Sequence, residues 1–141
     1  MGTFRRDPND WLRRLSPDEW IRAALGELRR ASSAFDRGDL RAGTVGVKRA
    51  AGMALNGALL VEPNPSWGRT YVEHLAALAA DEQVPDAVRS ACRAVLDAGV
   101  PAGGDVVHLR TPRGHQKALD AAGDVIAHAW VVVKRHGESE R

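Results

Sequence analysis

Residues 39–61 constrain the fold more than any other part of the chain. Their apolar positions recur at helical spacing, and a second side of the same helix is small and uncharged, with Gly46, Ala50, Ala54 and Gly57. A glycine inside a helix costs up to about 1 kcal/mol relative to alanine. A helix that is apolar on most sides belongs in the middle of a bundle, and its glycines predict that neighbouring backbones approach it closely.

Helix start and stop signals surround this central segment. Ser16 to Glu19 form a capping-box pattern with a proline at the first helical position, and Thr70 to Glu73 repeat the capping box. Apolar stripes then predict helices over residues 16–38, 39–61, 70–79, 85–98 and 111–137. Since no period-2 strand pattern of useful length occurs, the predicted class is all-α, an antiparallel up-and-down bundle of four to five helices.

The length of 141 residues suits a single domain. We divide the chain into a polar, arginine-rich N-terminal lead-in (1–15), one helical bundle domain (16–137) and a frayed tail (138–141). Residues 99–110 are the longest irregular stretch inside the bundle domain.

Composition narrows the cellular setting. The net charge of +2 is too small to establish a nucleic-acid surface. The single cysteine, Cys92, cannot form an internal disulfide and is expected to be a small core residue. The sequence contains no run of about 18 or more apolar residues, so it predicts no membrane span. The charged N-terminus does not resemble a secretory signal. A cytoplasmic protein without membrane association is the expectation.

Three stretches carry a family resemblance. The alanine-rich central segment 47–59, the segment 68–75 followed by the turn 84–88, and the loop 107–112 before the last helix resemble elements of small prokaryotic proteins of the HEPN superfamily (higher eukaryotes and prokaryotes nucleotide-binding). The resemblance covers roughly residues 17–135. It implies a four- to five-helix bundle that commonly dimerises. Some members of the family are metal-independent ribonucleases, and others bind RNA, nucleotides or a partner nucleotidyltransferase.

Arg110 and His115 are the candidate catalytic residues. Four residues separate them, which fits the Arg-to-His spacing of the family's ribonucleases at the start of the last helix. A histidine can serve as acid or base in RNA cleavage by the 2′-hydroxyl, while an arginine stabilises charge developing on the phosphate. The family's ribonucleases usually have Asn, Asp or His directly after the arginine, where this chain has Thr111. His115 also lies on the predicted core stripe. The alternative is therefore a packed histidine at the end of the bundle and a solvated arginine.

Arg113 and His74 are the candidate ligand-binding residues. Arg113 adds a second cation beside the Arg110–His115 pair, and His74 opens the third helix, where a structural role is the alternative. The histidines show no spacing typical of a metal site. The helical glycines do not follow a strand, so no dinucleotide fingerprint is present. We therefore expect neither a metal nor a cofactor.

Trp20, Trp130 and Val131 are the candidate interface residues. Trp20 and Trp130 fall at the edges of their apolar stripes, and Val131 falls on the otherwise polar face of the last helix. Partly exposed tryptophan and valine side chains are typical of interfaces, which favours a homodimer. The alternative is that each tryptophan covers the end of the core.

These observations lead to three functional hypotheses. The first is a HEPN-like binding or interaction module for a nucleotide, RNA or partner protein, without robust catalysis. The second is a HEPN-type ribonuclease that uses Arg110 and His115. The third is a structural helical bundle unrelated to nucleic acid.

Overall fold

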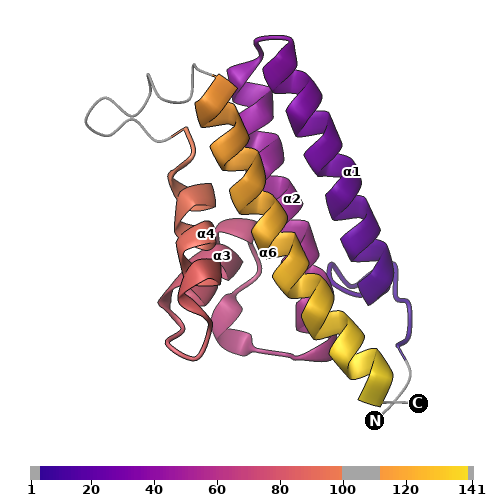
Figure 1. Ribbon diagram of the computed structural model, residues 1–141. Helices are drawn as coiled ribbons and strands as arrows, with labels where there is room; N and C mark the ends of the chain where they lie inside the picture. The colour runs from indigo at the N-terminus through magenta and orange to yellow at the C-terminus, as the bar shows by residue number, and fades with distance from the viewer. Residues whose placement is uncertain (1–3, 100–111, 140–141) are drawn as a thin grey trace.

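A computed structural model describes residues 4–99 and 112–139 (Figure 1). This part of the chain contains five α-helices, one short 3-10 helix and no strand, which confirms the predicted all-α class. The elements are α1 (Pro17–Asp36), α2 (Leu40–Val61), η1 (Pro65–Trp67), α3 (Tyr71–Ala80), α4 (Asp86–Asp97) and α6 (Pro112–Ser139). In Figure 1, α2 runs antiparallel to α1, and α6 runs antiparallel to α4.

The helix boundaries follow the local signals closely. Ser16 Oγ accepts a hydrogen bond from the Glu19 amide at 3.1 Å, and the Glu19 carboxylate accepts one from the Ser16 amide at 2.9 Å. Thr70 and Glu73 form the same reciprocal capping box at the start of α3. The last helix continues to Ser139, two residues beyond the end predicted at Gly137. One glycine near a helix end did not stop it, because the cost of about 1 kcal/mol is small against continued helix propagation.

α2 is the central helix, as its composition predicts, and it contacts α1, α3, α4 and α6. A Cβ added at Gly57 would lie 2.9 Å from the Pro17 carbonyl oxygen, and one at Gly46 would lie 2.9 Å from Ala31 Cβ. Both distances are shorter than ordinary van der Waals contact. These two glycines therefore allow the backbones of α1 and α2 to pack directly against each other.

α6 lies between α1 and α4 and closes the core (Figure 1). Its buried hydrophobic residues form one face: Ala118, Ala121, Ala122, Val125, Ile126, Ala129, Val132 and Val133. His115, which the sequence placed on the core stripe of this helix, is only partly buried.

Candidate functional site

Of the predicted Arg110–His115 pair the structure describes only His115, because Arg110 lies outside the described residues. The His115 ring stacks on the ring of Phe35, with centroids 4.5 Å apart and planes inclined by 14°. Its Nε2 is buried and has no hydrogen-bond partner within the described part of the chain. His115 thus packs against α1 instead of projecting into solvent.

Arg113 does not converge on His115. The two residues are two positions apart in α6, so their side chains leave the helix about 200° apart. Arg113 is exposed and borders a shallow depression of about 710 Å³ between α4 and α6, together with Ser90, Ala94 and Lys117. An anion held by Arg113 would therefore lie on the opposite side of α6 from the His115 ring.

His74 is fully buried, and both of its ring nitrogens are engaged. Nδ1 lies 2.8 Å from the Trp67 carbonyl oxygen, and Nε2 lies 2.8 Å from the side-chain amide of Asn56. The Trp11 ring stacks over His74 at a centroid distance of 5.9 Å, and Tyr71 meets its edge at 6.5 Å. The ring thereby connects α2, η1 and α3, and the N-terminal segment covers it.

Burial lowers the pKa of His74, since an imidazolium in this position would lose its hydration. The neutral ring carries one proton. Because the Trp67 carbonyl can only accept, Nδ1 must be the donor, and Nε2 is then an acceptor. A flip of the Asn56 amide presents its NH₂ group to Nε2. All three groups are satisfied in this way, so the arrangement supports a structural role for His74.

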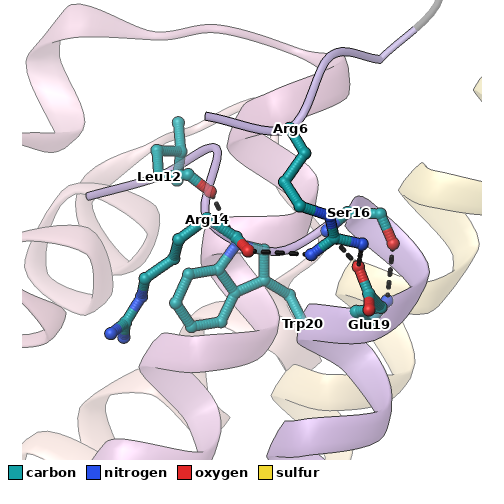
Figure 2. Close-up of polar contacts among 6 residues, drawn as sticks. All are labelled: Arg6, Leu12, Arg14, Ser16, Glu19 and Trp20. Carbon is teal, nitrogen blue, oxygen red and sulfur yellow. Dashed lines mark hydrogen bonds and ion pairs between the residues drawn. The ribbon is translucent and has the colours of Figure 1, made fainter. Parts of the chain in front are cut away.

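The structure corrects the expectation that Trp20 is an interface residue. It is 0% exposed, so its side chain is not part of a surface. Its indole Nε1–H donates a hydrogen bond to the Leu12 carbonyl oxygen at 2.8 Å (Figure 2). The helical stripe alone placed Trp20 at an edge, but the segment before α1 folds back and covers that edge.

Arg6 fastens this covering segment, as Figure 2 shows. Its guanidinium donates to the Arg14 carbonyl oxygen at 2.9 Å and forms an ion pair with Glu19. The Ser16 backbone hydrogen bond, followed by the Arg6 hydrogen bond, lowers the pKa of Glu19. Residues 6–14 are therefore tied to the first turn of α1, although their composition predicted only a polar lead-in.

Trp130 and Val131 do lie on the surface of α6, as predicted. They are 48% and 51% exposed. Lys134 Nζ lies 5.9 Å from the centre of the Trp130 ring and 3.4 Å from Asp18 Oδ1. Large apolar side chains with this exposure on one helix are the kind of feature that marks an interaction surface.

Sequence reasoning missed a cleft of about 480 Å³ between the end of α2, η1, the α3–α4 turn and α6. At its edge the Glu62 carboxylate accepts hydrogen bonds from Arg135 at 2.6 Å and from His136 Nε2 at 2.7 Å. Trp67, Leu78, Val84, Val131 and Val132 supply the apolar lining.

His128 also lines this cleft, and burial followed by the charge of Arg135 lowers its pKa. His128 and Arg135 are seven positions apart, a spacing that places them on one helix face. The sequence shows that spacing. It does not show that Glu62, 73 residues before Arg135, lies at the edge of the same cleft.

Cys92 is buried, and this burial raises the pKa of its thiol to about 11. A thiol with that pKa is protonated at neutral pH and is a poor nucleophile. The prediction that Cys92 is a small core residue is consistent with its complete burial.

Metal-binding clusters and membrane-spanning helices are both absent from residues 4–99 and 112–139. No group of three or more histidine, cysteine or acidic side chains is arranged to hold a metal ion there. None of the helices in this part of the chain combines the length and apolar character needed to span a membrane.

Comparison with known proteins adds no relative. No family model, no curated protein and no solved structure matches the chain significantly.

Proposed function

We propose that this protein is a HEPN-like binding or interaction module that acts as a homodimer or beside a partner protein, without robust catalysis of its own. The observation that carries the proposal is the outward face of α6, where Trp130 and Val131 are each about half exposed. Tryptophan is enriched among the residues that dominate binding energy in interfaces. A cytoplasmic location belongs to the same proposal, in keeping with the single buried, protonated thiol of Cys92.

His74 and His115 support a module in preference to an enzyme. Both ring nitrogens of His74 form hydrogen bonds within the protein, and the His115 ring lies against Phe35. A general acid or base must reach the proton that it transfers. Neither ring is presented to solvent in a way that meets this requirement.

The ribonuclease is the second candidate, and one observation favours it. His115 Nε2 lacks a hydrogen-bond partner among the described residues, as a nitrogen awaiting a substrate proton would. Arg110 would supply the phosphate contact in this hypothesis. The third candidate, a structural bundle unrelated to nucleic acid, is separated from the other two by the absence of RNA binding.

The test is light scattering on the purified protein, with and without a short single-stranded RNA, at low and at moderate salt. We expect a dimer that does not cleave the RNA. Any RNA affinity should fall with rising salt, because phosphate contacts release counterions. RNA cleavage that is lost in His115→Ala but kept in the matched control His136→Ala would overturn the module in favour of the ribonuclease. A monomer that binds neither RNA nor a partner would leave only the structural bundle.

A further inference from the structure

Three properties of the outward face of α6 occur together, and the first is its exposed apolar surface. Trp130 and Val131 flank this face, and Ala127 lies exposed between them. The helix has α1 on one side and α4 on the other (Figure 1). Within the described chain, about half of each of these two large side chains stays open to solvent.

The second property is a glycine that no contact within the described chain explains. A Cβ added at Gly123 would have nothing within 4 Å, whereas one at Gly57 would lie 2.9 Å from a backbone oxygen. Glycine is disfavoured in the interior of a helix. Its use at Gly123 is explained if another molecule approaches the helix closely at this position.

The third property is a groove beside that glycine. It has a volume of about 680 Å³, runs between α1 and α6, and takes its apolar lining from Leu25, Leu28, Leu119 and Gly123. Leu25 is 42% exposed there. Trp130 lies seven residues after Gly123, so it projects toward the same side of α6.

We infer that two copies of this chain pair antiparallel along α6, with a two-fold axis beside Ala127 and Trp130 of each copy seated in the α1–α6 groove of the other. This inference rests on the proposed function as an interaction module and names its partner. Trp130 is three residues after Ala127 and Gly123 is four before it. In an antiparallel pair, Trp130 therefore comes within one residue, about 1.5 Å along the helix, of the level of the partner's Gly123.

The charges on this face fit the same register. Asp120 is seven residues before Ala127 and Lys134 is seven after it, so each Lys134 stands level with the partner's Asp120. Both residues are exposed. The present contact of Lys134 with Asp18 joins side chains that are 46% and 56% exposed, a kind of ion pair that contributes little and is readily exchanged. A two-fold axis makes every such contact twice, as an isologous interface requires.

The experiment measures the oligomeric state by light scattering and sedimentation over a range of concentrations. Gly123→Leu fills the groove from a position with no neighbour, so the bundle should fold and the dimer should be lost. Gly26→Leu is the matched control. It is also a glycine within a helix, and the nearest atoms to an added Cβ are arginine tips at 3.7–3.8 Å. Trp130→Ala should raise the dimer dissociation constant at least about tenfold. Circular dichroism on each variant confirms that the bundle is intact.

A charge exchange tests the register. Lys134→Asp and Asp120→Lys should each weaken the dimer, and the double variant should restore it, because it places the lysine of one copy opposite the aspartate of the other. A double variant no better than the single ones overturns the antiparallel register. A dimer that tolerates Gly123→Leu, or a wild-type protein that is monomeric throughout, overturns the inference. If such a monomer still binds RNA, the proposed binding module stands without this dimer.

Discussion

Individual residues show most clearly how burial sets chemistry in this protein. The His74 imidazole and the Cys92 thiol are ordinary side chains whose ionisation is displaced by their surroundings. Desolvation lowers the pKa of His74 and raises the pKa of Cys92, because in each case burial disfavours the charged form. Both groups are therefore neutral at pH 7 and contribute to packing.

The lowered pKa of His74 predicts a pH-dependent stability. An unfolded histidine has a pKa of about 6.5, so below that pH the unfolded chain takes up a proton more readily than the folded chain. The contribution of His74 is complete above about pH 6.5 and is lost as the pH falls through the folded pKa. Urea unfolding should give a smaller free energy at about pH 5 than at about pH 7, and His74→Gln should reduce this difference.

His128 provides the comparison, since burial and Arg135 lower its pKa as well. His128→Gln should remove a separate part of the same pH dependence. The pKa values of Glu19, Glu62 and Glu73 are lowered too. The stability that these carboxylates contribute is lost only at lower pH, below their usual pKa of about 4.5. An unchanged slope in His74→Gln would contradict the assignment of a neutral, buried His74.

At the scale of elements, the pairing of α1 with α2 depends on glycine. Gly46 and Gly57 let the two backbones approach more closely than any side chain would allow. The sequence pointed to this, because glycines that recur on one side of an apolar helix indicate the close approach of a neighbouring backbone. The sequence could not identify α1 as the helix that packs there.

Gly57→Ala should destabilise the protein although alanine is the better helix former. The new methyl group would meet the Pro17 carbonyl oxygen at 2.9 Å, and backbone cannot move aside as a flexible side chain can. Overpacking costs about 1–3 kcal/mol, against a gain of up to about 1 kcal/mol from helix propensity. We expect a net loss of about 1–2 kcal/mol in chemical unfolding.

Gly26→Ala is the matched substitution on α1. Its added methyl would lie at ordinary contact distance from two arginine side chains, so only the gain in propensity remains. This variant should be more stable than wild type by about 0.5–1 kcal/mol. Equal effects of the two substitutions would show that the close approach of α1 to α2 is not as described.

At the scale of the whole molecule, the N-terminal segment belongs to the fold and is not an appendage. Its Trp11 covers His74, and the Leu12 carbonyl satisfies the indole of Trp20. Arg6 fastens the segment to the first turn of α1. Residues 4–15 thus close the end of the bundle at which α1 begins.

Removal of residues 1–15 should lower the free energy of unfolding by roughly 2–4 kcal/mol, since it uncovers apolar surface around Trp20 and removes the hydrogen bond from its indole N–H to the Leu12 carbonyl. Arg6→Ala breaks only an exposed ion pair and a hydrogen bond, and should cost less than about 1 kcal/mol. Thermal or urea unfolding of both variants measures the difference. A truncated chain as stable as Arg6→Ala would contradict a covering role for the segment.

The sequence alone determined the helical class, the start of each α-helix to within a residue or so, and the central position of α2. These properties depend on interactions between near neighbours: the capping boxes at Ser16 and Thr70, the prolines, and the 3.6-residue period of apolar side chains. Such signals act within one or two turns of helix, so the chain displays them without its tertiary structure.

Tertiary structure decided which side chains lie open to solvent. It buried Trp20 under Leu12, paired His74 with Asn56, and brought Glu62 to Arg135 across 73 positions of sequence. It also left Trp130 about half exposed, and open space beside Gly123, on the same side of α6. Each outcome depends on which segments meet in space, and a helical period specifies only that a face is apolar, not what covers it.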